Sequence, residues 1–196
     1  MYGIWAGSKG KKMADFVLQP VLTGKQITLL PLQADDFEAL YFAASDPLIW
    51  QQHPEPNRYQ REVFARFFDS GIASGSAFKV VDNQSGLIIG SSRYYDINLA
   101  ERELAIGYSF LARSHWGGVV NGEMKQLMLQ HAFLHVDKVW LHIGADNIRS
   151  RRAVEKIGGV FSHQVEVQNA AGETETKVHY YLTPALYQAA VSGAVI

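Results

Sequence analysis

The order of strand-like and helix-like segments between residues 77 and 182 constrains the fold more than any other feature of this sequence. Three strand-like runs, at 77–82, 87–98 and 102–111, are separated by short polar turns and indicate an antiparallel meander. A helical stripe over 121–136 then leads into a short, nearly all-apolar run at 138–143, which is typical of a buried strand. A strand-helix-strand unit that follows a meander predicts an α/β fold, with a mixed α+β sheet and helices on both faces.

The remaining segments extend this pattern on both sides. Strands are predicted at 16–22, 26–32, 160–168 and 174–182, helices at 34–45, 60–73 and 148–157, and an irregular loop at 46–59. The last of these helices ends at Gly158 and Gly159, which form a natural C-terminal stop. We find no internal repeat and no linker that would divide the chain.

The chain has 196 residues, of which 47% are hydrophobic and 19% are charged, as expected for one folded domain. We predict a single domain over 13–196. The segment 1–12 is rich in Gly and Lys and is predicted to be a flexible leader or an added tail. Without cysteine, the chain has no disulfide, no thiolate metal ligand and no cysteine nucleophile, which fits a reducing cytoplasm.

Charge and hydropathy exclude several classes of partner. The net charge of −1 supplies no broad basic surface, so we expect neither nucleic acid nor an anionic membrane as a partner. No apolar run reaches the roughly 18 residues that would span a bilayer. His131 and His135 have the i, i+4 spacing of a metal pair, but no acidic third ligand completes the motif, so no metal is predicted.

A glycine-containing turn lies between the strand that ends at 111 and the helix that starts near 121. Free backbone N–H groups at such a junction, with the positive end of the helix dipole, can bind a phosphate or pyrophosphate. Gly117 and Gly118 could also be present for steric reasons alone. The segment lacks the Gly-Lys-Ser/Thr of a P-loop and the three-glycine dinucleotide fingerprint, so neither nucleotide fold is supported.

These residues resemble the GNAT superfamily of N-acetyltransferases, in particular its ribosomal-protein N-acetyltransferase-like (Rim-type) branch. The resemblance extends from Ile27 to Leu182 and rests on Trp116-Gly117-Gly118, Glu123 and the run from Asn147 to Gly158. The run Asn-x-x-Ser-x-x-x-x-Glu-Lys-x-Gly, about thirty residues after the glycine turn, is its most specific part. The resemblance implies the GNAT acyl-CoA N-acyltransferase fold, with a mostly antiparallel twisted sheet and acetyl-CoA as co-substrate.

By position, the resemblance also implies a cofactor site. The residues implied at the pyrophosphate are Trp116, Gly117, Gly118, Val119, Val120, Asn121 and Gly122, and those along the pantetheine arm are Phe110, Leu111 and Ala112. Asn147 is implied near the pantetheine arm and the thioester, and Arg151 or Arg152 could meet a phosphate. The family's second glycine is Val119 here, so we expect negative φ at Val119, with Gly118 used instead.

The implied catalytic groups also depart from the family pattern. The tyrosine that often protonates the leaving thiolate is replaced by Val154, Ser150 is the implied substitute donor, and Asn147 is a second implied catalytic residue. Asn at the N-cap and Ser in the first turn are equally normal at a helix start. The glutamate expected before Ile106-Gly107-Tyr108 is Ala105. Glu103 could then act as the base, although a strand-end glutamate is often only a solvated charge.

The acceptor is predicted to be a primary amine, either a protein N-terminus or a small molecule. At pH 7 the neutral form costs roughly 1 kcal/mol for an α-amine and about 4.6 kcal/mol for lysine, so a weakly equipped base favours the α-amine. Trp50 and His53, in the loop that borders the family's acceptor pocket, are the candidate substrate residues, although loop aromatics can also pack as a lid. The alternative functions are a non-catalytic acyl-CoA-binding module and an enzyme that uses a longer acyl-CoA. The sequence does not determine the oligomeric state, for which a homodimer is one possibility.

Overall fold

A computed structural model describes residues 16–53, 55–168, 172 and 174–193. The predicted leader at 1–12 lies outside these residues, as does most of the turn between the last two strands. Eight strands form one sheet in the order β1-β2-β3-β4-β5-β6-β8-β7. Their bounds are β1 Leu22–Thr23, β2 Ile27–Pro31, β3 Ala77–Asp82, β4 Ile88–Asn98, β5 Glu103–Leu111, β6 Lys138–Gly144, β7 Val160–Gln168 and β8 Thr174–Leu182.

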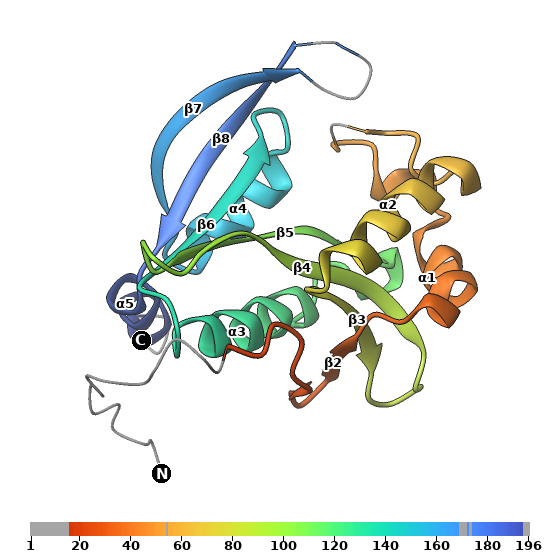
Figure 1. Ribbon diagram of the computed structural model, residues 1–196, viewed down its shortest axis with the longest axis horizontal. Helices are drawn as coiled ribbons and strands as arrows, with labels where there is room; N and C mark the ends of the chain where they lie inside the picture. Colours follow the sequence, from red (N-terminus) through yellow and green to blue (C-terminus); the bar gives the residue numbers. More distant parts are fainter. Residues whose placement is uncertain (1–15, 54, 169–171, 173, 194–196) are drawn as a thin grey trace.

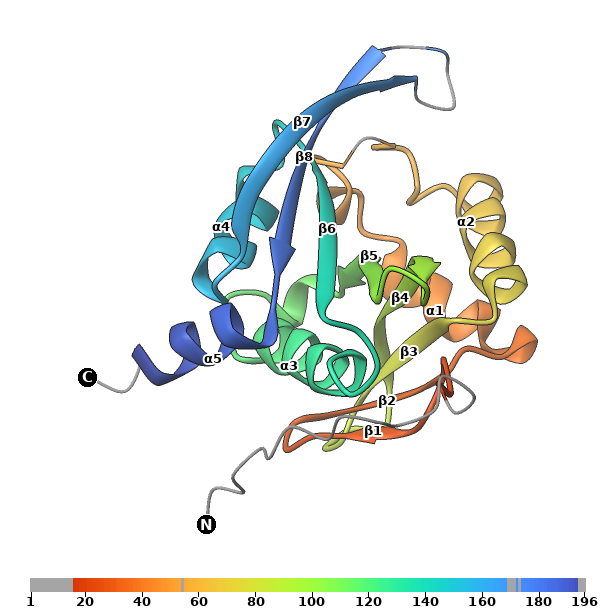
Figure 2. The ribbon, with the colours of Figure 1, turned by 60° about the vertical axis from the view of Figure 1, so that its left-hand side comes forward.

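Helices cover both faces of this sheet (Figures 1 and 2). Their bounds are α1 Phe37–Ala44, α2 Arg61–Ser74, α3 Val120–Ala132, α4 Ile148–Lys156 and α5 Pro184–Gly193. One hydrophobic cluster joins the sheet to α3 and includes Val154 of α4, with Tyr187 of α5 packed against it. A second cluster joins the other face to α1, α2 and Trp50. The prediction of a mixed, mostly antiparallel sheet with helices on both faces is confirmed.

Most predicted elements agree with the structure to within a few residues, and two do not. The prediction of a strand at 16–22 is wrong over most of its length, because only Leu22–Thr23 pairs with β2. Phe16 stacks instead on His135 of the segment after α3, with 4.5 Å between ring centroids. Helix α5 was not predicted. No helix among the described residues is long and apolar enough to cross a membrane.

The sheet divides between β5 and β6. These two strands are the parallel pair, and they are registered only from Glu103 opposite Lys138 to Ala105 opposite Trp140. Beyond that point β5 continues to Leu111 and β6 to Gly144 without registered pairing to each other. An unpaired strand edge exposes backbone donors and acceptors. The edge of β5 from Ile106 onward is therefore available to a ligand with peptide-like polar groups.

Candidate functional site

A β-bulge lies on β5 inside the split. Tyr108 has φ 52°, which is uncommon for a residue with a side chain, and the register with β4 shifts between Ser91 and Arg93. The bulge changes which face the following side chains occupy. Phe110 packs in the cluster beneath α1 and α2, while Ser109 accepts a hydrogen bond from Lys125 of α3 at 2.7 Å. The bulge therefore displaces the backbone of β5 at the point where the sheet is open.

Helix α3 begins without a side-chain cap. Its N-cap is Val119, at φ −80°, and its first hydrogen bond runs from the N–H of Glu123 to the carbonyl of Val119 at 2.9 Å. The N–H groups of the first helical turn therefore have no partner within the helix. Negative φ at Val119 was predicted and is confirmed. The predicted use of Gly118 is wrong, because the positive φ of 73° lies at Gly117.

The start of α3 is also open sterically. A Cβ atom placed on Gly117, Gly118 or Gly122 would meet no other atom within 4 Å. The side chain of Val119 is 65% exposed. Backbone N–H groups at the positive end of a helix, with open space before them, are suited to bind an anion.

The start of α4 has the opposite character. Asn147 is 7% exposed, and its Oδ1 accepts a hydrogen bond from the N–H of Ser150 at 3.1 Å. Arg151 donates to the Tyr180 hydroxyl at 3.2 Å and to the Ala145 carbonyl at 3.0 Å. These side chains hold the helix in place. Any further role of Asn147, Ser150 or Arg151 at a cofactor stays a prediction.

The two helix starts meet at the open end of the split. The guanidinium of Arg149, on α4, lies 3.9 Å from the centre of the Trp116 ring, just before α3. The Trp116 indole donates to the carbonyl of Leu111, the last residue of β5, at 2.9 Å. A groove of about 1050 Å³ continues from Ala112 and Trp116 along α1. The glycine turn at 116–118 and the run that starts at Asn147, which are about thirty residues apart in the sequence, thus lie on either side of one opening.

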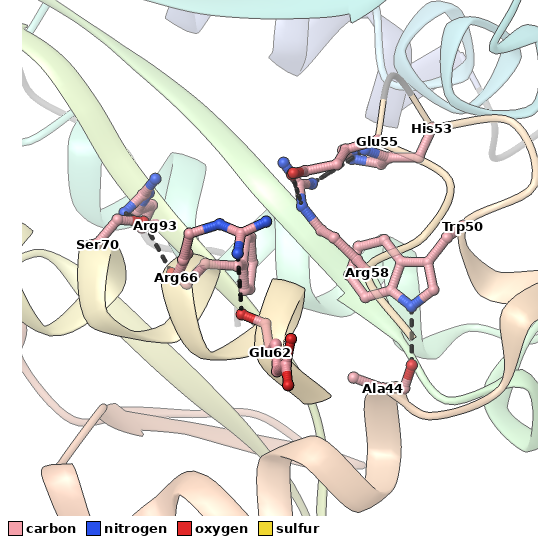
Figure 3. A network of polar contacts seen from close by, with 10 residues as sticks. Ala44, Trp50, His53, Glu55, Arg58, Glu62, Arg66, Ser70 and Arg93 are labelled. Carbon is pink, nitrogen blue, oxygen red and sulfur yellow. Dashed lines mark hydrogen bonds and ion pairs between the residues drawn. The ribbon is translucent and has the colours of Figure 1, made fainter. Parts of the chain in front are cut away.

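The loop before α2 contains a cationic and aromatic group of side chains (Figure 3). Arg58 pairs with Glu55 at 2.8 Å, contacts the His53 ring at 3.0 Å and lies 4.8 Å above the Phe67 ring. Burial, followed by the charges of Arg58, Arg149 and Lys177, lowers the pKa of His53 to about 3, so this ring is neutral at pH 7. Lys177 is on β8, so the loop that carries His53 is close enough to that strand for its charge to act on the ring.

Trp50 and Glu103 are more enclosed than their predicted roles suggest. Trp50 is 1% exposed and donates from its indole to the Ala44 carbonyl at 2.8 Å, so it is a core residue, and its contact with a substrate stays a prediction. Glu103 accepts from the Trp140 indole at 3.0 Å and lies 3.5 Å from the Lys138 ammonium. It is at the paired end of the split, five residues before the bulge.

Glu123 of α3 has a structural role, because its carboxylate contacts the turn between β1 and β2. Its carboxylate accepts hydrogen bonds from the N–H groups of Lys25 and Gln26, and it approaches Gly24 so closely that a Cβ there would collide with it. It therefore ties the β1–β2 turn to α3. These contacts of Glu123 are structural and link two segments that are distant in the sequence.

Three polar residues beside the split were not identified from the sequence. Tyr95 of β4 and His142 of β6 are joined by a hydrogen bond of 3.0 Å between the hydroxyl and Nδ1. On the α3 face, burial lowers the pKa of Lys125 to about 8 while its ammonium donates to Ser109. A histidine within an otherwise apolar strand was the one available signal for this group. Within the described ranges, no three His, Cys, Asp or Glu residues are arranged to hold a metal ion.

Comparison with known proteins agrees with this geometry. A family model described as an acetyltransferase (GNAT) domain matches residues 26–160. A search of curated proteins found no match. Among solved structures, a GCN5-related N-acetyltransferase from Brucella melitensis is 22% identical, with a TM-score of 0.78 over 89% of this chain and 85% of that one.

Two further structures are similar. The GNAT-family acetyltransferase from Bacillus anthracis is 17% identical, with a TM-score of 0.69 over 84% of this chain and 98% of that one. The microcin C7 self-immunity acetyltransferase MccE, solved with acetyl-CoA and AMP, is 15% identical, with a TM-score of 0.70 over 86% and 99%. At these identities the likeness concerns the fold.

Proposed function

Because the chain belongs to the GNAT family of acetyltransferases, we propose that it transfers the acetyl group of acetyl-CoA to a primary amine by direct attack in a ternary complex. The observation that carries the proposal is the split between β5 and β6, which leaves the edge of β5 unpaired beside the open first turn of α3. One long ligand with an amide-containing arm and a pyrophosphate could satisfy both features.

The residues present fit such a ligand. The backbone of Phe110, Leu111 and Ala112 would pair with the pantetheine arm as an added strand does. The segment 116–122 would hold the pyrophosphate through backbone N–H groups, supported by the open space at its glycines. MccE has a similar fold and was solved with acetyl-CoA, which supports the same choice of donor here.

The reaction needs no covalent enzyme intermediate. The neutral amine attacks the thioester carbon while backbone N–H groups near Phe110 and Leu111 stabilise the negative charge that develops on the carbonyl oxygen. Ser150, half-buried in the first turn of α4, would donate a proton to the departing thiolate, directly or through a water molecule. Full turnover in Ser150→Ala would remove this residue from the mechanism.

An amine of low pKa is the proposed acceptor. The neutral α-amine costs roughly 3.5 kcal/mol less than the neutral lysine amine at pH 7, from ordinary pKa values near 7.8 and 10.4. Glu103 is already engaged by Trp140 and Lys138, so it is at most an indirect base for this acceptor, acting through water. Protein N-termini and small molecules with α-amines are therefore the preferred class.

A two-stage experiment tests the proposal. Acetyl-CoA at 100 times its dissociation constant should stabilise the protein by about 2.7 kcal/mol. Thiol release with a panel of free amino acids, tripeptides and lysine side-chain peptides should then show turnover on α-amines. Robust acetylation of lysine side chains alone would rule out the proposed acceptor class.

The same measurements separate the alternatives. Binding without turnover on any amine would favour a non-catalytic module, which the valine at 154 and the alanine at 105 make a specific alternative. Comparing the product mass with acetyl-CoA and succinyl-CoA would identify an enzyme for longer acyl groups. Absence of stabilisation by any acyl-CoA would reject the proposed function.

A further inference from the structure

A tyrosine crosses the split on the face that α2 covers. Tyr94 points toward α3, where its hydroxyl donates to the Met128 carbonyl at 2.8 Å, so its neighbour Tyr95 points to the opposite face. From β4 the ring of Tyr95 extends over β5 at Gly107, where a Cβ would lie only 2.7 Å from the ring. Gly107 therefore permits this crossing, and the hydroxyl reaches His142 of β6 at 3.0 Å.

The position of this pair within the split is well defined. Tyr95 is opposite Ala105, and Ala105 is opposite Trp140, the last registered pair between β5 and β6. Gly107 and His142 each lie two residues further along their strands. The Tyr95 hydroxyl thus occupies the first open position of the split, one residue before the bulge at Tyr108.

The surroundings favour a neutral imidazole. The titratable and charged groups that face His142 are Tyr95 and Asp96 from β4, Lys177 and His179 from β8, and His163 from β7. Burial is the main cause that lowers the pKa of His142 from its ordinary 6.5, opposed by Asp96, whose carboxylate is 3.8 Å from Nδ1. Burial also raises the pKa of Tyr95, which keeps the phenol protonated.

We propose that Tyr95 is a catalytic residue of the acetyl transfer and that His142 is the positioning residue that accepts its proton. As the amine nitrogen bonds to the thioester carbon, one amine proton moves to Oη of Tyr95 while the Tyr95 proton moves to Nδ1 of His142. The C–S bond then breaks, Ser150 donates its proton to the departing thiolate, and the proton on His142 passes through Tyr95 and water to Ser150. The products are the amide and coenzyme A, with the enzyme unchanged.

Tyr95 and His142 lie where the proposed site lacks the base that the family would supply. The resemblance places a glutamate at residue 105, where this chain has alanine opposite Tyr95, and the absence of a side chain at Gly107 allows the Tyr95 ring to lie over β5. Glu103 is held at the paired end of the split by Trp140 and Lys138. This inference rests on the proposed function, because it assigns roles for the same reaction.

The test compares Tyr95→Phe and His142→Gln with two matched controls on the same face. Tyr181→Phe removes a hydroxyl from a ring that packs on Trp140, and His163→Gln removes an imidazole that contacts His179 instead of Tyr95. Each protein is assayed with acetyl-CoA and the panel amine that the wild type turns over fastest. Tyr95→Phe and His142→Gln should lose about 100-fold in kcat with little change in KM for acetyl-CoA, and the controls should stay within about two-fold.

The pH profile separates proton transfer from a structural effect. Protonation of the amine makes log kcat/KM fall with a slope of one below about pH 8. In the wild type the slope should approach two only at a pH below 6.5, because burial lowers the pKa of His142 from that ordinary value and its ring must also be neutral. Both test variants should keep a slope of one. Test variants as active as Tyr181→Phe, with an unchanged profile, would overturn the inference and leave the proposed function intact.

A readout that needs only binding completes the design. Nitrogen NMR of the imidazoles should show the His142 signals shifting when acetyl-CoA binds, and the His163 signals should stay in place. If acetyl-CoA stabilises the protein and the His142 signals do not move, the inference is wrong. If acetyl-CoA neither stabilises the protein nor is turned over, the proposed function fails first, and the inference falls with it.

Discussion

The starts of α3 and α4 lie on either side of one opening but are built in opposite ways. At α4, Asn147 caps the helix and Arg151 bonds Tyr180 and Ala145, so the polar side chains already have partners within the chain. At α3, the N-cap is Val119, whose side chain cannot accept a hydrogen bond, and the glycines around the first turn have open space beside them. The α4 segment resembles the family better, yet the α3 segment has more unsatisfied donors.

This difference shows that a sequence motif can match a family for two reasons, because its residues are needed for folding or because they bind a ligand. A run that matches well can be required for folding, because capping and packing fix its residues. A site that binds a ligand must leave its donors without internal partners, and such a site can tolerate Val119 where the family has glycine. Four sets of variants test this contrast.

The largest expected effect is on stability, at the end of α4. Gly158 has φ 89°, and a Cβ there would lie 2.7 Å from the Leu186 carbonyl and 2.9 Å from Ala190. Gly158→Ala should lower the free energy of unfolding by about 3 kcal/mol, measured by urea denaturation. Gly86→Ala is the matched control, since Gly86 has φ 71° and no neighbour within 4 Å, and it should cost about 1 kcal/mol. Equal losses would mean that packing does not explain Gly158.

The next effect is on affinity, at the start of α3. Val119→Asp should satisfy first-turn N–H groups and place a negative charge beside the pyrophosphate, which should weaken acetyl-CoA binding about tenfold, or about 1.4 kcal/mol. Calorimetry at two salt concentrations would measure it. Val119→Ser supplies the cap without the charge and should raise stability by about 0.5 to 1 kcal/mol. Unchanged affinity in Val119→Asp would place the pyrophosphate elsewhere.

A smaller loss is expected when the cap of α4 is removed. Asn147→Ala should cost about 1 kcal/mol of stability, because the Ser150 N–H loses its acceptor, and Asn147→Ser should restore most of it. Thermal unfolding and turnover are measured on both variants. If Asn147→Ser regains stability while turnover stays low, Asn147 has a chemical role that the cap does not explain.

The smallest effect is expected at Arg151. Arg151→Met removes hydrogen bonds to Tyr180 and Ala145 and should cost about 0.5 to 1 kcal/mol, with acetyl-CoA affinity changed less than about twofold. A tenfold loss of affinity, together with a weaker salt dependence, would instead confirm the phosphate contact that the resemblance implied. Arg152→Met, an exposed neighbour on the same helix, is the control.

Periodicity was sufficient to predict most of the fold. The strands at 77–82, 160–168 and 174–182 agree with the predicted bounds, because alternation and flanking turns are local signals. The segment 16–21 was mistaken for a strand because it is rich in apolar residues, yet Phe16 packs against the core without joining the ladder, and Val17 and Val21 are exposed. The final helix was missed although its start carries local signals, since Thr183 accepts a hydrogen bond from the N–H of Leu186 and Pro184 is its first residue.

The site was predicted less completely. The glycine turn could be located from the sequence, but which residue takes positive φ could not, since Gly117 and Gly118 are chemically identical. The contact between Tyr95 and His142 joins residues on two strands separated by a third, so no spacing in the sequence reveals it. Sequence patterns describe single elements, whereas this pair depends on how far β5 and β6 diverge.

The brevity of the β5–β6 pairing has a consequence for how the molecule opens. Only three registered residue pairs join the antiparallel part that contains β1 to β5 with the part that contains β6 to β8. Amide hydrogens in the two parts are therefore expected to exchange as two cooperative units, with the seam among the first to open. A ligand bound along β5 would act as the missing strand at that seam. Its arrival would merge the two exchange units into one.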